Sequence, residues 1–468
     1  MTLSENARYS RNYFMYEQFV WLATEEPAAA ALIEATGRVT SRAELLGRTR
    51  ALSDELSTAG FAEGDLLAVQ LPNSVDFVAT WLAALERRLV FVPIDRDAPE
   101  TEVGAILTHF GVKGLLYRPD RASPSIALTT RPATLHPPLP REARLVKLTS
   151  GSTGQPKGIV ASEENLIADC HNICSTMQIT SRDRNLGAIP FSHSYGFSNL
   201  VLPLVQQGTA VVISNDYLPQ SIIDLSNHHR CTVAPLIPMV FEHLASVPRG
   251  HGEFHSIRTF ISAGAPLPPA SSRRFRERFG IDIHSFYGCS ECGGITYDRE
   301  GASVERGSVG KAMSGVDLEL DGSRLAVRSA SVALGYLVDD RTFQPLESGR
   351  FVTDDLVEVR ESGEIVLTGR VSDLINTAGK KVNPREVEQI ILQIEGVRQA
   401  KVYGEPAGAR GEVVAAAVVA NPDLTREQIR EFCRERLSLH KVPRIIKLIE
   451  SIPVDERGKV KRAALALL

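Results

Sequence analysis

The chain has 468 residues, of which 43% are hydrophobic, and its 56 acidic and 52 basic residues give a formal net charge of -4. This length exceeds the roughly 100–200 residues of a typical domain, so we expect more than one globular core. The near balance of charge argues against a strong overall field that would attract nucleic acid or an anionic membrane. No nucleic-acid partner is therefore expected.

The N-terminal stretch 1–16 mixes charged and aromatic residues and lacks the apolar core and cleavage site of a secretory signal. No apolar run reaches the roughly 18 residues that a membrane-spanning helix needs. Six cysteines are too few to cross-link a chain of this size, and a reducing compartment would keep them as thiols. We expect a cytoplasmic protein without a transmembrane segment.

Two cysteine spacings resemble fragments of zinc sites, namely Cys170-His171-x-x-Cys174 and Cys289-x-x-Cys292. Structural zinc takes four ligands, usually from two separated pairs. Cys170 and Cys174 have the i, i+4 spacing of one helix face, and unpaired cysteine ordinarily behaves as a small buried hydrophobe. We therefore favour buried thiols over a zinc site.

The first half of the chain alternates short apolar runs with amphipathic stretches. Helical spacing predicts helices over Ser41–Gly60 and Val75–Glu86, separated by a strand and a Pro72-Asn73-Ser74 turn. Strands, or strands followed by helices, are expected at Asp65–Leu71, Leu89–Ile94, Leu145–Leu148, Gly208–Ser214, Thr232–Leu244 and Thr259–Ala263. This alternation is typical of parallel or mixed sheets covered by helices.

The second half changes in pattern. Arg121–Arg141, rich in Pro, Ser and Thr, is expected to be irregular, and Ser303–Arg360 to be rich in short strands. Beyond Arg370 we expect helices at Asn383–Ile394 and Thr425–Leu437, and strands at Ala400–Gly404 and Val413–Ala420. We predict an α/β protein with a large N-terminal domain over residues 1–370, which includes the β-rich subdomain, and a small mobile α+β domain over residues 371–468.

A loop rich in hydroxyl groups and glycine follows the predicted strand Leu145–Leu148. It reads Thr149-Ser150-Gly151-Ser152-Thr153-Gly154-Gln155-Pro156-Lys157-Gly158. Glycine lets backbone N–H groups approach an anion, and the hydroxyls and the Lys157 ammonium add donors. The order differs from a Walker loop, in which Gly-Lys-Ser/Thr opens a helix. We predict a phosphate-binding loop; taken alone, it could also be a plain linker.

Other motifs accompany this loop. They are Gly64-Asp65, Leu71-Pro72-Asn73-Ser74, Pro190–Gly196, Ala263-Gly264-Ala265-Pro266, Tyr287-Gly288-Cys289-Ser290-Glu291, Thr353-Asp354-Asp355, Gly369-Arg370 and Gly458-Lys459. In this order they resemble the adenylate-forming superfamily of acyl- and aryl-CoA synthetases, peptide-synthetase adenylation domains and luciferases, over nearly the whole chain. The resemblance implies an enzyme that uses ATP and Mg²⁺ to convert a carboxylic acid into acyl-AMP, releases pyrophosphate, and passes the acyl group to a thiol.

The resemblance also implies roles for individual residues. The loop would hold the β- and γ-phosphates, while Glu291 and Thr153 would supply oxygen ligands for Mg²⁺. Tyr287 would stack on adenine, Asp355 would bind the ribose hydroxyls, and Arg370 the ribose or a phosphate. The residues expected at the nucleotides are Thr149, Ser150, Gly151, Ser152, Thr153, Gly154, Lys157, Ala263, Gly264, Ala265, Pro266, Tyr287, Gly288, Ser290, Asp355, Arg370 and Lys381. A surface salt bridge is the alternative for Glu291.

Lys459 lies nine residues from the end and would ordinarily be a solvated lysine. In the family, the matching lysine bridges the substrate carboxylate and the α-phosphate during adenylation. For thioester formation the small domain rotates about a hinge, here Val371-Ser372-Asp373, although relatives commonly carry an acidic residue or lysine in place of Ser372. Gly379 would then admit the pantetheine arm, with Lys380 or Lys381 near phosphates.

The acyl pocket is expected to be lined by His193, Tyr195, Val240, Ser262, Gly288 and Cys289, with Gly293-Gly294 leaving space. No acidic residue occurs in Pro190–Phe197, where amino-acid-activating relatives pair the substrate ammonium, and an unpaired buried ammonium would be costly. His193 resembles the aromatic or histidine gate of acyl- and aryl-CoA synthetases; a structural histidine is the alternative. We expect a fatty or aryl acid without charge at its far end.

Three positions depart from the family pattern. Ser290 replaces a commoner threonine, Asp354 stands where glycine is frequent, and Arg87-Arg88 stand where one glycine is usual. None removes a group that the chemistry requires. The thiol acceptor is expected to be CoA, or alternatively the phosphopantetheine arm of a free-standing carrier protein. The remaining alternative is a nucleotide-binding relative without activity.

Overall fold

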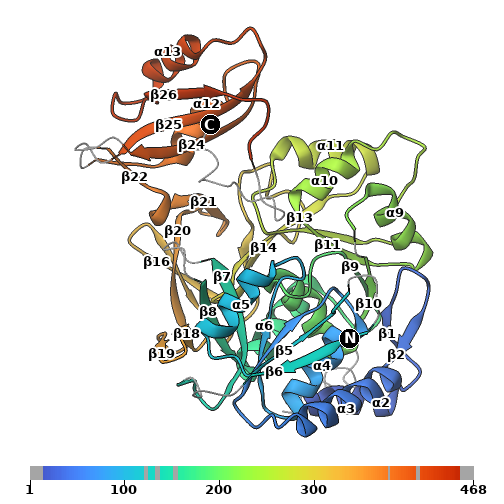
Figure 1. Cartoon of the computed structure of the whole chain (residues 1–468). Coiled ribbons are helices and arrows are strands. Elements are labelled where there is room, and N and C mark those ends of the chain that lie inside the picture. The colour runs from blue at the N-terminus through green and yellow to red at the C-terminus, as the bar shows by residue number, and fades with distance from the viewer. Residues whose placement is uncertain are drawn as a thin grey trace. The chain divides into compact units, whose positions relative to one another are not determined.

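The computed structural model describes residues 14–120, 125–131, 138–150, 156–214, 216–377, 380–406 and 412–453, without the side chains of residues 150 and 156 (Figure 1). The chain divides into two compact units, Met1–Leu318 with Val327–Phe351, and Glu319–Ala326 with Val352–Leu468. In the described parts of the chain, no helix combines the length and apolar character needed to cross a membrane. The domain boundary predicted after Arg370, with its hinge, stays a prediction.

The first unit contains an eight-stranded sheet of order β19-β18-β8-β7-β4-β3-β5-β6. Its strands are β3 (Leu66–Gln70), β4 (Val90–Pro93), β5 (Gly114–Tyr117), β6 (Ala127–Thr130), β7 (Ala143–Ser150), β8 (Pro156–Ser162), β18 (Gly335–Asp339) and β19 (Thr342–Pro345). The central strands β5, β3, β4 and β7 are parallel, and antiparallel strands extend both edges. The strand β6 corrects the expectation that this part of 121–141 is irregular, because Ala127–Thr130 pairs with β5.

A nine-stranded sheet of order β15-β14-β13-β12-β11-β9-β10-β1-β2 belongs to the same unit. Its strands are β1 (Ala30–Ile33), β2 (Val39–Ser41), β9 (Arg184–Gly187), β10 (Ala210–Ile213), β11 (Val233–Leu236), β12 (Thr259–Ser262), β13 (Ile283–Cys289), β14 (Gly293–Tyr297) and β15 (Lys311–Ala312). Parallel pairs run from β1 through β13, whereas β2, β14 and β15 pair antiparallel. The predicted mixed α/β class is confirmed.

Helices cover these sheets (Figure 1). They are α2 (Met15–Glu25), α3 (Arg42–Thr58), α4 (Val75–Glu86), α5 (Glu100–His109), α6 (Glu163–Met177), the short α7 (Ser194–Gly196), the π-helical η1 (Phe197–Val201), α8 (Leu202–Gln207), α9 (Pro219–His228), α10 (Pro238–Ala245) and α11 (Pro269–Phe279). Helix α6 contacts β7 and β8 of one sheet and β14 of the other. It therefore lies between the two sheets and couples them.

Sequence-coded caps begin several of these helices. Ser41 and Glu44 form a reciprocal capping box at the start of α3, and Ser74 accepts a hydrogen bond from the Phe77 backbone at the start of α4. These side chains satisfy backbone N–H groups that have no partner within the helix. The predicted helices over Ser41–Gly60 and Val75–Glu86 are confirmed.

Helix α4 ends in a turn that explains one departure from the family pattern. Arg88 has φ +55°, a left-handed conformation that favours glycine, and Leu89 N donates to Ala84 O at 2.8 Å. This is the hydrogen-bonding pattern of a Schellman turn, whose left-handed position is usually glycine. Arginine here retains the turn at an energetic cost.

The second unit contains most of a four-stranded sheet and a compact C-terminal part. The strands are β16 (Asp317–Asp321), β17 (Arg324–Arg328), β20 (Arg350–Val359) and β21 (Ile365–Arg370), then β22 (Ile375–Thr377) with β23 (Lys380–Val382), and β24 (Val397–Pro406), β25 (Glu412–Ala420) and β26 (Ile445–Leu448). Its helices are the 3-10 turn η2 (Val371–Asp373), α12 (Pro384–Ile391) and α13 (Arg426–Arg436). Val387, Val414 and Ile429 share one buried core, so the predicted small α+β domain is confirmed.

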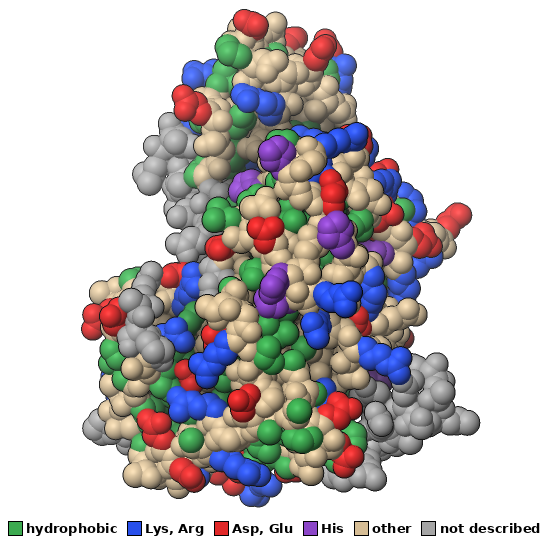
Figure 2. Space-filling view, turned by 90° about the vertical axis from the view of Figure 1, so that its right-hand side faces the viewer, with side chains coloured by type: hydrophobic (Ala, Val, Ile, Leu, Met, Phe, Trp, Pro, Cys, Tyr) green, Lys and Arg blue, Asp and Glu red, His purple; other side chains and the backbone are tan. Residues whose placement is uncertain are grey.

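Charged side chains are interspersed on the surface. On the face drawn in Figure 2, Lys and Arg alternate with Asp and Glu over the described residues. This distribution agrees with the small net charge of -4.

Candidate active site

The hairpin of β7 and β8 carries the predicted phosphate loop. Its register pairs Thr149 with Lys157, so the hydroxyl and the ammonium that flank the loop extend from one face of the sheet. Thr149 Oγ1 donates to the Lys157 carbonyl oxygen at 3.4 Å. A Cβ on Gly158 would lie 2.5 Å from Val146 Cγ1, so packing requires glycine after the lysine. The predicted loop residues Gly151, Ser152, Thr153 and Gly154 lie outside the described residues.

Tyr336, which the motifs did not indicate, joins Lys157 to Glu291. On strand β18 it lies opposite Ile159 of β8, and Lys157 is two residues before Ile159, so the lysine and the tyrosine share a face. The Lys157 Nζ is 5.9 Å from the centroid of the Tyr336 ring. The Tyr336 hydroxyl donates to Glu291 Oε1 at 3.1 Å. Two motifs far apart in sequence thus meet around one aromatic ring.

Glu291 lies in the turn between β13 and β14. The backbone N–H of Ala333 donates to the Glu291 carbonyl oxygen at 2.8 Å, which fixes the turn, and the side chain is half-buried. Over the described parts of the chain, no group of three His, Cys, Asp or Glu could by itself hold a metal ion. Mg²⁺ is commonly held by one or two carboxylates together with substrate phosphates. A single oriented carboxylate near Lys157, which is predicted to bind phosphate, fits that mode.

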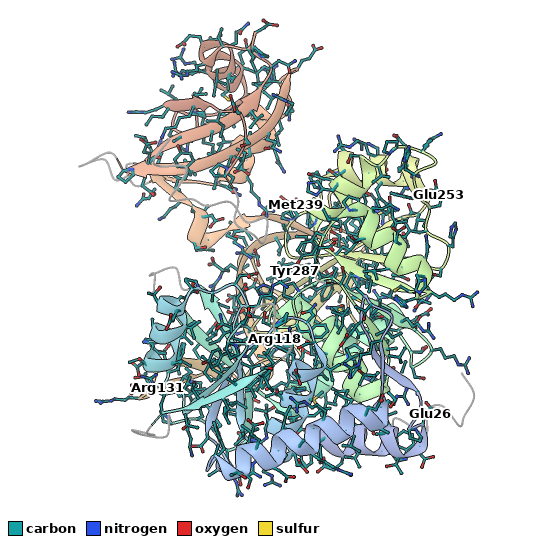
Figure 3. The ribbon with its side chains drawn as sticks, turned by 45° about the vertical axis from the view of Figure 1, so that its right-hand side comes forward. Glu26, Arg118, Arg131, Met239, Glu253 and Tyr287 are labelled. Carbon is teal, nitrogen blue, oxygen red and sulfur yellow. The ribbon has the colours of Figure 1, made fainter. Side chains whose placement is uncertain are left out.

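Tyr287, the candidate for adenine stacking, stands on β13 opposite Thr296 and is 9% exposed (Figure 3). Its neighbour Gly288 lies so close to β14 that a Cβ would be 2.4 Å from Gly293 O. Gly293 has φ +72°. The two strands therefore approach closely because glycine occupies both positions.

The expectation that Gly293-Gly294 leave space for the acyl group is wrong. A Cβ on Gly293 would lie 2.1 Å from Asp169 Oδ1, and one on Gly294 would lie 2.7 Å from Met313 Sδ. Other side chains already fill these places. The glycines allow β14 to pack closely against α6 and Met313.

Asp169 of α6 holds β14 in place through its side chain. It is 2% exposed, accepts from the Gly294 backbone N–H at 2.9 Å and accepts from Ser198 Oγ at 2.6 Å. A buried carboxylate with two donors ties α6, η1 and β14 together. A polar residue on the buried face of an amphipathic helix was the only sequence signal for it.

The turn Ser262–Pro266 follows β12. Ser262 is 2% exposed, and within the described part of the chain its hydroxyl has no hydrogen-bond partner. Gly264 takes φ +88°, which the sharp turn after the strand requires. The position of this turn beside adenine remains a prediction, and so does the place of Ser262 in the lining of the acyl pocket.

Two buried aromatic residues position the His193 segment. Phe191 packs against Phe77 and Phe197 packs against Trp81, with ring centroids 5.7 and 5.2 Å apart. His193 lies between these anchors at the start of α7, and is only partly buried. Edge-to-face packing of this kind fixes backbone position within a dense core.

Asp95 reaches His193 from another part of the chain. His193 Nε2 is 3.4 Å from Asp95 Oδ2, and both side chains are about a quarter exposed. Asp95 Oδ1 also accepts from the Asp97 backbone N–H at 3.0 Å. No acid occurs in Pro190–Phe197, as noted from the sequence, but the structure supplies one from the segment after β4. Its position beyond the carboxyl end of a parallel strand was an available signal.

Two further residues of the predicted acyl pocket have structural roles of their own. The Tyr195 hydroxyl donates to Ile261 O at 3.0 Å, and burial raises the pKa of this phenol well above its ordinary value. Val240 is 0% exposed and packs in a core cluster with Phe241 and Leu244. Their contact with substrate stays a prediction.

Neighbouring motifs contact each other at Ser194 and Ser290, whose hydroxyl oxygens are 2.8 Å apart. This contact gives the hydroxyl at position 290 a partner, so serine can replace the commoner threonine. Close by, a hydrogen bond with Cys292 and burial raise the pKa of the Cys289 thiol. All six cysteines are free thiols, and Cys170 Sγ is 3.9 Å from Cys174 Sγ.

In the second unit, Asp355 and Arg370 are cross-strand partners on β20 and β21. Arg370 Nε donates to Asp355 Oδ1 at 2.7 Å; Asp355 is 4% exposed, whereas the Arg370 side chain is 51% exposed. Asp354, the departure from glycine, accepts from the Ser372 backbone N–H at 3.2 Å and so contacts the predicted hinge. Lys381 is exposed on β23, and Gly379 and Lys459 lie outside the described residues.

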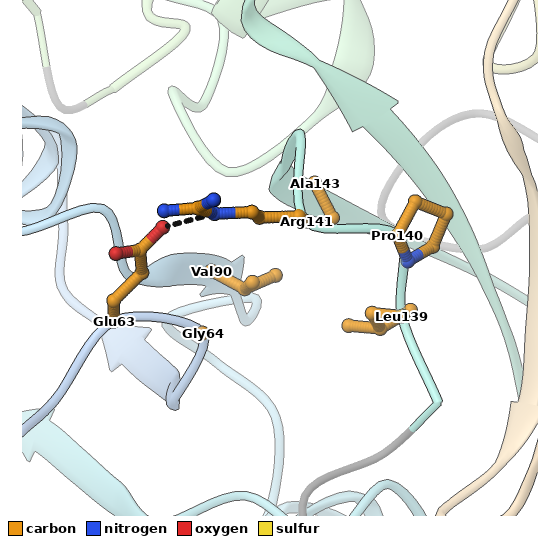
Figure 4. A pocket seen from close by; sticks show the side chains of 7 residues that line it. All are labelled: Glu63, Gly64, Val90, Leu139, Pro140, Arg141 and Ala143. Atoms are coloured by element: carbon orange, nitrogen blue, oxygen red, sulfur yellow. Dashed lines mark hydrogen bonds and ion pairs between the residues drawn. The ribbon is translucent and has the colours of Figure 1, made fainter.

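A cavity of about 370 Å³ lies elsewhere in the first unit (Figure 4). It is lined by Glu63, Gly64, Val90, Leu139, Pro140, Arg141 and Ala143. The ion pair of Arg141 Nε with Glu63 Oε1, at 3.1 Å, borders it and holds the pKa of the glutamate below its ordinary value. None of the predicted site residues lines this cavity, so we do not place the chemistry there.

The chain is similar to known proteins both in sequence and in fold. Residues 19–337 match the AMP-binding enzyme family, and residues 386–459 match its C-terminal domain. The chain is 26% identical to the long-chain-fatty-acid–CoA ligase FadD13 of Mycobacterium tuberculosis over 95% of this chain and 96% of that protein, and 28% identical to a feruloyl-CoA synthase of an Amycolatopsis species over 92% and 94%. The fold matches ATP-bound MatB from Rhodopseudomonas palustris with a TM-score of 0.80 at 24% identity, covering 97% and 98% of the two chains. The chain belongs to the AMP-binding enzyme family of the adenylate-forming superfamily.

Proposed function

We propose that this chain is an ATP-dependent acid–CoA ligase that forms an acyl-AMP, releases pyrophosphate and transfers the acyl group to the thiol of CoA. The observation that carries the proposal is the convergence of Lys157 and Glu291, from separate motifs, on Tyr336. Family membership and the CoA-ligase names of the relatives support the same reaction.

The residues of the first unit match the demands of adenylation. Negative charge builds on the phosphates as the carboxylate attacks the α-phosphorus and pyrophosphate leaves. We assign the β- and γ-phosphates to the Lys157 ammonium and the Thr149 hydroxyl, and a metal-ligand oxygen to Glu291. Mg²⁺, when bound, neutralises phosphate charge and orients the phosphate oxygens. Tyr287 offers its ring to adenine.

The second unit supplies further predicted contacts. Arg370 holds one oxygen of the nearly buried Asp355 at 2.7 Å, so this carboxylate has a fixed orientation in which to accept from ribose hydroxyls. Lys459 is assigned to the substrate carboxylate and the α-phosphate, and Lys381 to phosphates of the thiol substrate. These roles are proposals from the family motifs.

We propose a fatty or aryl acid as the substrate. One named relative acts on long-chain fatty acids and another forms feruloyl-CoA. The pair of His193 and Asp95 adds a polar group to a segment that is otherwise anchored by Phe191 and Phe197. This pair is the place where acids of the two classes would be distinguished.

The test is acid-dependent exchange of labelled pyrophosphate into ATP, run over aliphatic, aryl and amino acids. Exchange with at least one aliphatic or aryl acid that has no charge at its far end supports the ligase. No exchange with any acid would contradict it and favour a nucleotide-binding relative without activity. The acceptor is tested with CoA and, separately, with a phosphopantetheinylated carrier protein. If a thioester forms on the carrier protein and not on CoA, the thiol acceptor is the carrier protein. A cytoplasmic location remains a prediction, to be tested by cell fractionation.

A further inference from the structure

Tyr336 contacts Glu291 and Lys157 in two different ways. The first is a hydroxyl-to-carboxylate hydrogen bond of 3.1 Å, and the second places a lysine 5.9 Å from the ring centroid. The hydroxyl and the ring of one side chain therefore act on two different charged groups. Substitutions that remove one and keep the other can separate them.

The sheet holds Tyr336 in place for both contacts. Its strand β18 pairs with β8, with Leu337 opposite Gly158, and Leu337 is fully buried. Gly158 tolerates no side chain because Val146 lies against it. The backbone on both sides of Tyr336 is thus fixed by the same packing that sets the position of Lys157.

The chemical state of Tyr336 suits a donor. A tyrosine hydroxyl has one proton to donate and an ionised carboxylate can only accept, so the hydrogen bond of 3.1 Å runs from Tyr336 to Glu291. An O–H donor to one oxygen restricts rotation of the carboxylate and leaves its second oxygen for a ligand. Outer partners of metal-ligating carboxylates commonly act in this way.

Resting on the proposed function, we propose that Tyr336 is a positioning residue with two separable effects: its hydroxyl orients Glu291 for the metal that accompanies ATP, and its ring supports Lys157 at the phosphates. The hydroxyl therefore governs metal affinity. The ring governs nucleotide affinity in the absence of metal.

The experiment measures two affinities in each protein. The concentration of free Mn²⁺ is measured by electron paramagnetic resonance in the presence of saturating ATP. ATP binding without metal is measured by equilibrium dialysis in excess EDTA. For Tyr336→Phe we expect about tenfold weaker Mn²⁺ binding, the lower end for loss of an outer partner, with metal-free ATP affinity changed by less than about twofold. For Tyr336→Leu we expect both affinities to fall, the metal-free ATP affinity by about threefold, the size of a modest cation–π contact.

Tyr16→Phe is the matched control, because Tyr16 donates to Glu86 Oε1 at 2.7 Å between helices α2 and α4. It removes the same kind of hydrogen bond at another place, and should leave both affinities unchanged. In the background of Glu291→Gln, adding Tyr336→Phe should weaken Mn²⁺ binding by less than about twofold, because the effect acts through the carboxylate. A full tenfold additional loss in that background would overturn the proposal.

Unfolding curves accompany each titration. If Tyr336→Phe does not fold, Tyr336→His and Tyr336→Leu are compared instead: a histidine N–H can donate to Glu291, so its Mn²⁺ affinity should exceed that of the leucine variant at least threefold, and equal affinities would contradict the inference. Unaltered Mn²⁺ binding by a folded Tyr336→Phe also contradicts it. If the wild-type protein shows no acid-dependent exchange, the proposed function fails; if it exchanges but Tyr336→Phe binds Mn²⁺ normally, only this inference fails.

Discussion

The phosphate end and the acid end of the candidate site are built differently. At the phosphate end, Lys157 and Glu291 belong to recognisable motifs and meet around Tyr336, whose ring centroid is 5.9 Å from Lys157 Nζ and whose hydroxyl donates to Glu291 Oε1 at 3.1 Å. At the acid end, His193 is anchored by aromatic packing around it and is approached by Asp95, which lies in none of the motifs. The difference explains why motifs indicate the reaction far better than the substrate.

The largest effect is expected for Lys459→Ala, which tests the phosphate end. Loss of a cation that stabilises charge in the transition state should reduce pyrophosphate exchange by about 10²–10³-fold. Thioester formation from supplied acyl-AMP should stay within a few-fold of wild type, because the lysine is assigned to the first half-reaction. Lys461→Ala is the neighbouring control and should retain both activities. An equal loss of both half-reactions in Lys459→Ala would break this assignment.

A second prediction concerns the hydrogen bonds that Asp169 accepts from β14, the strand that pairs with the Tyr287 strand β13. Asp169→Ala removes the acceptor for Gly294 N and Ser198 Oγ and should lower the free energy of unfolding by about 3 kcal/mol, since each buried unsatisfied donor costs about 1–3 kcal/mol. Denaturant unfolding measures the change. Asp169→Asn keeps one acceptor oxygen and should lose less. If the alanine variant were as stable as wild type, this carboxylate would not stabilise the contact of α6 with β14 and η1.

The acid end is tested by Asp95→Asn. The pair with His193 is partly exposed at 3.4 Å, so its coupling should be at most about 1 kcal/mol, or about fivefold in kcat/KM for the acid. The KM for ATP should not change. Asp97→Asn, on the same segment, serves as the control. A change in the KM for ATP without a change in kcat/KM for the acid would indicate that Asp95 acts on nucleotide binding and not on the acid.

The smallest effect is expected at the turn before β4, the strand that leads to Asp95. Arg88→Gly should raise the free energy of unfolding by about 0.5–1 kcal/mol, because glycine adopts φ +55° without steric cost. Arg88→Ala retains the strained conformation while removing the long side chain, so comparison of the two isolates the backbone contribution. Activity should be unaffected in both. A destabilised glycine variant would indicate that the arginine side chain outweighs the strain.

Much of the fold could be predicted because local signals agreed with the tertiary structure. The capping serine and apolar spacing of α3, and the capping serine and mostly apolar sequence of α4, suffice to place both helices. The short strand β6 was missed because Ala127–Thr130 lies in a Pro- and Ser-rich segment and pairs only at the sheet edge. Edge pairing depends on a neighbour that a local pattern does not contain.

The site residues that belong to motifs could be predicted from the sequence. Tyr336, Asp169 and Asp95 were missed because each reaches the site through strand register or helix packing rather than through a motif. Gly293-Gly294 were misjudged for the same reason: glycine indicates a close approach, but only the structure shows that Asp169 and Met313 are the neighbours. Such contacts are set by tertiary packing, which spacing along the chain does not encode.

The most direct measurement of the central claim is the stoichiometry of products when ATP, CoA and an acid selected by the exchange assay react. We predict equal amounts of AMP, pyrophosphate and acyl-CoA, resolved by chromatography and mass spectrometry, with none formed when the acid is omitted. Formation of ADP and phosphate in proportion to acyl-CoA would contradict the account, because it would place bond cleavage at the γ-phosphate instead of the α-phosphate.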